Sequence, residues 1–354
     1  MKRILIGADF VSSPCNQKYF DEGKLKEIID PELYALMTGA DYKIYNLELP
    51  LANKDTPIVK WAGSMRCPTS TINGYKEMGV SLFATSNNHI LDNKKEGLQS
   101  TYDTLNKAGI PYTGSGMSVE EAEKPYTFML GDKKIGIFNC CEHEFSTAQE
   151  YGHGANVFDA LYSLDAIEEF SKQVDYLIVL YHGGKECYRY PSPYLQRVCR
   201  RIADKGANLV ICQHTHCVGC EEDYNGSKIV YGQGNTLFVL EGYGSNEYWD
   251  TNVLVTVDYD GKDFKVGYIP VNHTELGLEL DKTGEIMANF NKRTEQIKQP
   301  GFIKENYVKF CNVEVNEYLP RIQELNELAM INYFECEPHR ELIITALKDK
   351  TFEK

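Results

Sequence analysis

The 354-residue sequence contains no apolar run long enough to cross a membrane. A transmembrane helix needs about 18–20 consecutive apolar residues. Near the N-terminus the apolar run 4–8 is followed at once by Asp9, so it is shorter than the core of about 7–15 residues that a signal peptide requires. We therefore predict a first β-strand here, in a cytoplasmic protein without a membrane span.

Positive charge is also scarce. The 37 lysines and arginines are outnumbered by 51 aspartates and glutamates, which gives a formal net charge of −14. This balance argues against a generic nucleic-acid binder and against docking on an anionic membrane surface. A polyanionic substrate would also be repelled, unless a bound cation lay in the site.

A regular cysteine framework is missing as well. The eleven cysteines are odd in number and irregularly spaced, which is typical of reduced thiols in a cytosolic enzyme. The pair in Cys217-Val218-Gly219-Cys220 has no second pair to complete a zinc site. We interpret both as buried thiols.

The order of the predicted elements indicates an α/β fold. In the first half of the chain, short apolar runs alternate with helical patterns, which is typical of a layered domain with a parallel sheet. After Ser227 the hydrophobic period approaches two and predicts antiparallel strands. These strands are expected at Lys228–Tyr231, Leu237–Leu240, Val253–Tyr259 and Phe264–Pro270.

Helical patterns carry their own start and stop signals. Asp92 stands before a pattern that ends at Gly109, so we predict Asp92 as the N-cap of a helix. Beyond about residue 275 the pattern is helical to the C-terminus. We expect a domain of residues 1–272 and a mainly helical extension, residues 273–354, packed on it. Homodimerisation through the apolar face of the extension is the weaker alternative.

Metal-competent side chains follow five predicted strands at the point where each strand ends. In open α/β sheets, ligands bind outside the carboxyl ends of the strands. Carboxylates, imidazoles and an amide can together hold two divalent cations about 3.5–4 Å apart, and this mixture favours Mn, Fe or Zn. The side chains are Asp9, Asn46 with Glu48, Asn88 with His89, His182, and His214 with His216.

The stretch Gln213-His214-Thr215-His216 is the clearest of these signals. On an extended strand, two histidines at positions i and i+2 point to opposite faces. On a turn just beyond the strand end they can converge on one ion. We therefore expect a turn here, with one or two divalent ions bound nearby.

Several of these stretches also carry a family resemblance. They resemble the CapA family, which is named for poly-γ-glutamate capsule biosynthesis and belongs to the calcineurin-like metallophosphatase superfamily. The resemblance spans about residues 1–272 and implies a layered fold of mixed sheets flanked by helices. The stretches are Asn46-Leu47-Glu48, Ser86-Asn87-Asn88-His89-Ile90-Leu91-Asp92, Ala108-Gly109-Ile110 with Gly114, His182-Gly183-Gly184-Lys185-Glu186, Gln213-His214-Thr215-His216 and Gly232-Gln233-Gly234-Asn235.

The resemblance implies a role for each candidate residue. The metal ligands would be Asp9, Glu48 in place of the usual bridging aspartate, Asn88, His182, His214 and His216. His89 would be the catalytic residue that contacts phosphate or donates a proton. Lys185 and Glu186 contact substrate or pair at the surface, Asn46 is a further substrate-binding candidate, and Asn235 lines the site or only forms a turn.

Two departures from the superfamily pattern affect the number of metals. The first motif normally has a histidine two residues after the aspartate, whereas Asp9 is followed by Phe10 and Val11. Glutamate at the bridge is also longer by one methylene. We expect His216 to complete the metal near Asp9. His214 would then serve the metal near Asn88 and His182, and it is the favoured ligand if only one ion binds.

Three functional hypotheses follow. The first is a metal-dependent hydrolase with a phosphoesterase-type reaction that uses metal-activated water on a small-molecule or polyanionic substrate. The second is a capsule-related protein that acts on γ-glutamyl amide bonds. The third is a non-catalytic binding module with a degenerate metal site. We favour an enzyme.

Overall fold

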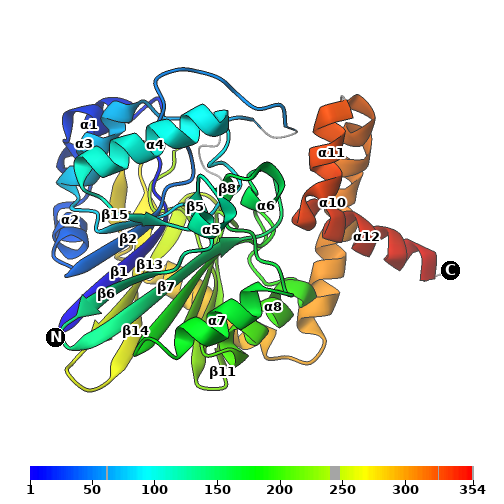
Figure 1. Cartoon of the computed structure of the whole chain (residues 1–354). Coiled ribbons are helices and arrows are strands. Elements are labelled where there is room, and N and C mark those ends of the chain that lie inside the picture. The colour runs from blue at the N-terminus through cyan, green and yellow to red at the C-terminus, as the bar shows by residue number, and fades with distance from the viewer. Residues whose placement is uncertain (61–62, 240–247, 326, 353–354) are drawn as a thin grey trace.

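Two β-sheets with helices on their outer faces form the body of the protein (Figure 1). The computed structural model describes residues 1–60, 63–239, 248–325 and 327–352. In these ranges no helix combines the length and the apolar character needed to cross a membrane. The predicted layered α/β fold, with mixed sheets flanked by helices, is confirmed.

The first sheet has seven strands. Four neighbouring strands are parallel, and three antiparallel strands extend the sheet beside β1. In spatial order the strands are β15 (Leu278–Leu280), β14 (Phe264–His273), β13 (Thr251–Tyr259), β1 (Lys2–Asp9), β2 (Tyr42–Asn46), β3 (Leu82–Ala84) and β4 (Tyr112–Thr113).

The second sheet has six strands and is also mixed. Its central strands are parallel, and an antiparallel strand closes each edge. A small separate sheet pairs β5 (Ser115–Gly116) with β8 (Gly154–Ala155). The six strands are, in spatial order, β11 (Val218–Tyr224), β12 (Ser227–Gln233), β10 (Leu209–Gln213), β9 (Tyr176–His182), β7 (Lys133–Cys141) and β6 (Tyr126–Leu130).

The apolar core between the sheets follows from the period of two along each strand. Ile4 and Ile6 of β1 share one buried cluster with Ile178 of β9 and Ile211 of β10. The intervening Leu5 points to the opposite face and joins a different cluster. Burying each such side chain stabilises the fold by about 1.5–3 kcal/mol, so this alternation fixes which face of β1 meets the second sheet.

Helices cover the outer face of each sheet (Figure 1). The helices α1 to α4 pack on the first sheet, and α7 and α8 pack on the second. The helices in the body of the protein are α1 (Gln17–Glu22), α2 (Pro31–Thr38), α3 (Ile72–Glu77), α4 (Lys94–Ala108), α5 (Val119–Ala122), α6 (Ala148–Tyr151), α7 (Ser163–Ser171) and α8 (Pro193–Asp204), with 3₁₀ turns at Leu25–Glu27 and Thr69–Thr71.

The C-terminal helices pack against one side of this body (Figure 1). They are α9 (Glu285–Ile297), α10 (Phe302–Glu324), α11 (Glu327–Glu335) and α12 (Glu337–Phe352). Tyr307 of α10 and Leu342 of α12 share a buried cluster with Tyr188 from the loop after β9. The backbone N–H of Glu337 donates to the carbonyl of His143, at 2.9 Å. The extension is therefore attached to two loops that follow strand ends.

Some predictions about the elements were wrong. The strand expected at Leu237–Leu240 is reduced to a single bridge between Leu237 and Phe10, and residue 240 lies outside the described residues. Strand β11 was not predicted, because its first residues were interpreted only as a pair of buried thiols; those thiols are indeed buried and unpaired. The parallel strands expected in the first half of the chain are divided between the two mixed sheets. The short strand β15 lies just beyond the expected boundary at residue 272 and pairs with β14.

Candidate metal centre

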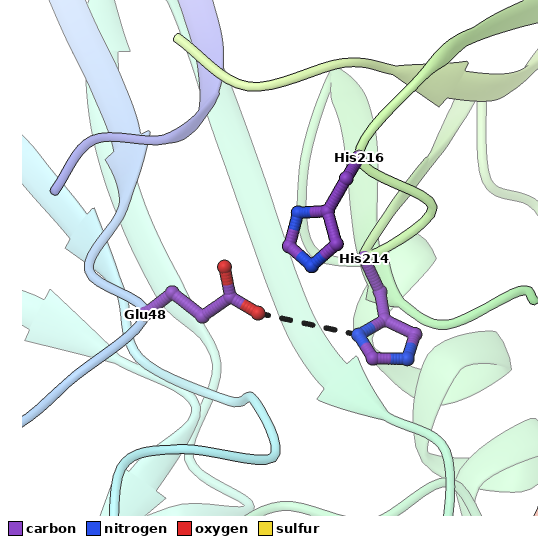
Figure 2. A group of neighbouring side chains, drawn as sticks. All are labelled: Glu48, His214 and His216. Carbon is purple, nitrogen blue, oxygen red and sulfur yellow. Dashed lines mark ion pairs between the residues drawn. The ribbon is translucent and has the colours of Figure 1, made fainter. Parts of the chain in front are cut away.

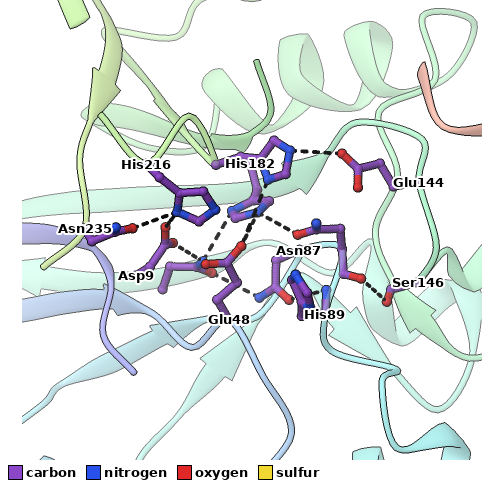
Figure 3. Close-up of polar contacts among 12 residues, drawn as sticks. Asp9, Glu48, Asn87, His89, Glu144, Ser146, His182, His216 and Asn235 are labelled. Carbon is purple, nitrogen blue, oxygen red and sulfur yellow. Dashed lines mark hydrogen bonds and ion pairs between the residues drawn. The ribbon is translucent and has the colours of Figure 1, made fainter. Parts of the chain in front are cut away.

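The carboxyl ends of strands from both sheets meet at one place (Figure 3). β1, β2 and β3 of the first sheet run parallel, as do β9 and β10 of the second. The predicted ligands that follow these strands are all buried: Asp9 and Glu48 at 0% exposure, His182 at 2%, Asn88 and His214 at 4% and His216 at 6%. Burial of this many ionisable groups together is costly unless they are paired or coordinate a cation.

Two overlapping groups of side chains have the spacing of metal ligands. Glu48, His214 and His216 form one group (Figure 2), and Asp9, Glu48 and His182 form the other. Within each group, one ligand atom per residue lies within 4.8 Å of the others. Glu48 belongs to both groups, which is the position expected of a bridging carboxylate.

Several of these contacts match the pairing expected from the sequence. His182 Nε2 lies 3.0 Å from Asn88 Oδ1, and His216 Nδ1 lies 3.3 Å from Asp9 Oδ2. His214 and His182 are neighbours, with ring centroids 4.9 Å apart. The two ligand groups that share Glu48 differ from the expected pairing. One contains His214 with His216, and the other contains His182 with Asp9.

The most informative atoms are those without a hydrogen bond. Both carboxylate oxygens of Glu48 and Nδ1 of His214 are buried and have no hydrogen-bond partner in the described part of the chain. Glu48 Oε1 lies 3.2 Å from His182 Nε2 and 4.0 Å from His214 Nδ1, without hydrogen-bond geometry. Leaving a buried polar group unsatisfied costs about 1–3 kcal/mol. A divalent cation would satisfy all three atoms, so the residues fit a metal ion.

The two carboxylates of the site have opposite pKa shifts. Burial, together with the negative charge of Asp9, raises the pKa of Glu48 well above its usual range. Burial acts in the same direction on Asp9, but hydrogen bonding to His216 and the charge of His182 outweigh it and lower its pKa to about 2. One carboxylate therefore stays ionised while the other needs a nearby cation to ionise at neutral pH.

Asn46 and Asn235 orient the predicted ligands. The Asn46 amide donates to Asp9 Oδ1 at 2.6 Å and lies 3.2 Å from His182 Nδ1. Asn235 Oδ1 lies 2.8 Å from His216 Nδ1. Both asparagines are fully buried. They contact side chains of the predicted ligand set, as the outer partners of metal ligands commonly do.

The two histidines of the loop after β10 converge because their backbone is unusual. β10 ends at Gln213, and His214 and His216 have φ angles of 86° and 53°. A residue other than glycine in this left-handed region costs on the order of 1–3 kcal/mol, and such strain is concentrated at functional sites. The expected turn is present.

Glu144 joins the site and was not predicted from the sequence. Its Oε1 lies 3.1 Å from His214 Nε2 (Figure 3). Burial would raise the pKa of Glu144, but the charge of His214 lowers it to about 2, and Glu144 in turn raises the pKa of His214. Reasoning from strand ends missed Glu144 because it lies three residues beyond the end of β7 at Cys141.

His89 belongs to a second buried cluster with Asp92 and Lys60. His89 Nδ1 and Lys60 Nζ each lie 2.6 Å from a different oxygen of Asp92. The N-cap prediction for Asp92 was wrong: α4 begins at Lys94, and the Asp92 carboxylate instead accepts from Lys60 and from the backbone N–H of Met65. Burial and the charge of Lys60 lower the pKa of His89, which favours its neutral ring.

Lys185 and Glu186 lie between this site and the C-terminal extension. Lys185 is 9% exposed, and its Nζ lies 5.4 Å from the ring centroid of Tyr318 on α10. Glu186 is exposed. The extension thus supplies an aromatic partner to Lys185, which lies three residues after His182.

The two positions after Asp9 are part of the apolar core. Phe10 packs against Phe20, Tyr45 and Tyr75, and Val11 is 1% exposed. On the other side of His216, the Trp249 ring lies with its centroid 4.3 Å away. No extra imidazole takes the place of the missing histidine in the two ligand groups found among the described residues.

Comparison with known proteins assigns the family. Residues 17–239, well over half of the chain, match the model of the family described as bacterial capsule synthesis protein. The chain belongs to this family. The match includes Glu48, Asn88 and the histidines of the site, and it ends before the C-terminal helices. Asp9 lies ahead of the matched residues.

Curated relatives share this part of the chain. The PGA biosynthesis protein CapA of Bacillus subtilis is 23% identical over 242 residues, covering 66% of this chain and 63% of its own length. The capsule biosynthesis protein CapA of Bacillus anthracis is 21% identical over 57% of this chain and 51% of its own. A probable polyglutamine synthesis accessory protein of Mycobacterium tuberculosis is 27% identical over 55% and 56%. The chain thus spans about half to three-fifths of these relatives.

Solved structures are more distantly similar. A hypothetical protein from Thermus thermophilus aligns with a TM-score of 0.49 at 13% identity, over 77% of this chain and 100% of its own. A phosphatase from Mycoplasma pneumoniae aligns with a TM-score of 0.47 at 14% identity, over 77% and 93%. Likenesses of this degree assign no activity.

Proposed function

We propose that this capsule synthesis family member is a metal-dependent hydrolase with a phosphoesterase-type reaction. The observation that carries the proposal is Glu48, a fully buried carboxylate shared by both ligand groups. Neither of its oxygens is hydrogen-bonded to a residue that the structure describes. A carboxylate kept in this state only for packing would be less favourable than an apolar residue of the same size. Its retention is explained if it binds a cation.

The ligands of one or two ions would come from both groups. Asp9, Glu48, Asn88, His182, His214 and His216 would hold the metal, with Mn, Fe or Zn suited to this mixture of carboxylate and imidazole. When bound, such an ion supplies Lewis acidity and makes water a better nucleophile at neutral pH. Because the protein carries a net charge of −14, the ion would also offset the repulsion of an anionic substrate.

His89 is the residue proposed to exchange a proton with substrate. Its Nδ1 is directed at Asp92, so the neutral ring, assigned from this geometry, has Nε2 as an acceptor. Asp92, which also accepts from Lys60, holds the ring in one orientation. In that position, His89 takes up a proton at Nε2 and releases it to the leaving group, a step that typically contributes about 10²–10⁴-fold to the rate.

Metal analysis and a turnover assay test the proposal. The purified protein should contain a transition metal or take up Mn or Zn, and should then hydrolyse a phosphomonoester or phosphodiester such as a nitrophenyl phosphate. His89→Ala should lower the rate by about 10²–10⁴-fold, while the control His153→Ala, on a loop outside the ligand groups, should leave it unchanged. If neither metal uptake nor turnover is seen, the hydrolase proposal fails. Full biological activity in His89→Ala would favour the non-catalytic module instead.

A second candidate reaction comes from the relatives' names, which refer to PGA and polyglutamine synthesis. The same centre could act on γ-glutamyl amide bonds, because a Lewis acid polarises an amide carbonyl as well as a phosphoryl oxygen. Incubation with γ-linked glutamate oligomers, followed by mass spectrometry, separates the two reactions. Shortened oligomers without phosphoester turnover would select the amide reaction, and intact oligomers would exclude it.

A further inference from the structure

A pocket lies between the loop after β9 and the C-terminal helices α9 and α10. Its volume is about 640 Å³, which is within the range of about 300–1,000 Å³ found for small-molecule sites. Nine of its fourteen lining residues come from α9 and α10, which follow the residues that the family model matches. The pocket is therefore a feature of this chain's extension.

The charge of this pocket is opposite to that of the protein as a whole. Four basic side chains line it, Arg189, Lys292, Arg293 and Lys309, and one acidic side chain, Glu314. The protein has 51 acidic and 37 basic side chains, so an average patch of its surface is acidic. A local excess of positive charge in a concave site attracts anions and raises their local concentration.

Arg293 is the central feature of the pocket. It is only 9% exposed, and its Nε donates to the carbonyl of Gly219 at 2.7 Å. In the ranges that the structure describes, no carboxylate forms an ion pair with Arg293, Lys292 or Lys309. Burial and the nearby charge of Arg189 lower the pKa of Arg293. Burying a cation beside another cation is costly, and a bound anion would relieve that cost.

The pocket also has groups that recognise an anion by geometry. The Arg189 guanidinium lies 4.3 Å from the ring centroid of Tyr248, a contact that restrains its orientation. Tyr190 donates to Gln296 at 2.8 Å, which ties the loop to α9. A guanidinium such as that of Arg293 can bind a carboxylate or phosphate with two parallel hydrogen bonds.

Backbone contacts connect this pocket to the metal centre. The N–H of Cys187 donates to the carbonyl of Thr215 at 2.9 Å, and Thr215 lies between the two histidines of the ligand loop. Tyr248 on the pocket wall precedes Trp249, whose ring packs on His216. Cys187 and Tyr248 of the pocket wall are therefore connected to the loop that carries His214 and His216, although that loop does not itself line the pocket.

We infer that this pocket is an anion-binding site for a ligand that carries a carboxylate or a phosphate group. The inference goes beyond the proposed hydrolase activity and does not depend on it, because the pocket contains none of the predicted metal ligands. The two sources of such an anion, a phosphorylated molecule and an acidic chain, share the chemistry that the arginines and lysines recognise.

Calorimetric titration of the full-length protein, stripped of metal, tests this inference. Inorganic phosphate and a γ-linked glutamate trimer are the two probes. The double variant Lys292→Glu/Lys309→Glu should bind at least one of them about tenfold more weakly than the wild type, because like charge at an anion site is strongly unfavourable. Both lysines are exposed, so the variant should fold, and an unchanged melting temperature would show this.

A matched control separates a specific site from general electrostatics. Lys262→Glu/Lys298→Glu makes the same charge change at exposed positions outside the pocket, with side chains 86% and 61% exposed. Its affinities should stay within about twofold of the wild type. A loss for phosphate alone points to a phosphorylated ligand, and a loss for the trimer alone to an acidic chain. Absence of binding to the wild type, or equal losses in both double variants, would overturn the inference. Since no metal is present, these outcomes are independent of the hydrolase assay.

Discussion

Two buried polar clusters lie close together at the ends of the strands, and they differ in one respect. In the cluster of Lys60, His89 and Asp92, each charged group has an opposite or hydrogen-bonding partner within 3.0 Å. In the cluster around Glu48, three buried polar atoms have no hydrogen bond among the described residues. The first cluster is complete with protein atoms alone, whereas the second is not.

This difference indicates what each cluster is built to do. A fully satisfied buried network fixes the geometry of its members, so His89 is held in place before any substrate arrives. An unsatisfied network is unstable by itself and gains most from a ligand that completes it. The predicted metal ligands should therefore respond to an added cation, and the His89 cluster should not.

Metal removal should have the largest effect of all. Chelation should reduce phosphoester turnover to background, and Mn or Zn should restore it. Added metal should also raise the melting temperature, since a ligand at 100 times its dissociation constant stabilises the folded state by about 2.7 kcal/mol. Calcium serves as the control, because it prefers sites built from six to eight oxygen ligands. Equal turnover with and without chelator would remove the distinction between the two clusters.

Asp92→Asn should strongly destabilise the protein, because it leaves Lys60 buried without its counter-charge. The Lys60 and Asp92 side chains are both 0% exposed. Breaking such a pair costs about 3–5 kcal/mol, measured as the free energy of unfolding in urea. Asp103→Asn, on the exposed side of α4, should change it by less than about 0.5 kcal/mol.

A double variant sharpens this prediction. Lys60→Met combined with Asp92→Asn removes both charges, so it should recover part of the stability lost in the single variant. If the double variant loses as much as the two single variants added together, Lys60 and Asp92 are not coupled and the cluster is not the satisfied network described above.

Glu48→Gln should have a smaller effect of the opposite sign. Burial and the charge of Asp9 raise the pKa of Glu48, so the metal-free chain must take up a proton there when it folds at neutral pH. Glutamine needs no such proton, so the metal-free protein should become more stable at neutral pH, while metal uptake is lost. Glu144→Gln is the matched comparison within the same site. It breaks the contact with His214, so the metal-free protein should become less stable. Destabilisation by both substitutions would contradict the account of Glu48.

Glu341 on α12 is intermediate between the two clusters, because it is half-buried but has a hydrogen-bond donor. Its substitution should have the smallest effect on stability. Glu341 accepts from Ser192 at 3.0 Å, yet burial, with the charge of Glu337, raises its pKa from 4.5 to about 7. The unfolded chain therefore loses the Glu341 proton at lower pH than the folded one, so stability should fall as the pH rises from about 4.5 to 7. Melting temperatures at pH 5 and pH 8 should differ less in Glu341→Gln than in the wild type. An identical difference would show that Glu341 does not titrate in this range.

The sequence predicted the positions where ligands would come together but not the full set of contacts. Strand ends can be recognised from apolar runs, and a polar residue just after such a run must lie at the edge of the sheet. That reasoning brought Asp9, Glu48 and the histidines to one place. It did not identify Glu144, because this residue lies three positions beyond the end of β7 and not directly after the strand.

Other features could not be obtained from local patterns. Lys60 lies 29 and 32 residues before His89 and Asp92, in a stretch without periodicity, so only the tertiary structure shows the contact. Asp92 satisfies the usual signal for a helix N-cap, but its buried interactions with Lys60 and His89 outweigh the small gain from capping. The left-handed backbone of His214 and His216 is likewise imposed by the surrounding loop rather than by residue type.

Anomalous diffraction from crystals grown with Mn or Zn tests the central claim most directly. We predict one or two anomalous peaks within coordination distance, about 2.0–2.2 Å, of the Glu48 carboxylate, with His214 Nδ1 among the ligands of one ion. A structure at the same metal concentration in which no peak lies near Glu48, and in which the protein itself hydrogen-bonds both of its oxygens, would contradict the claim.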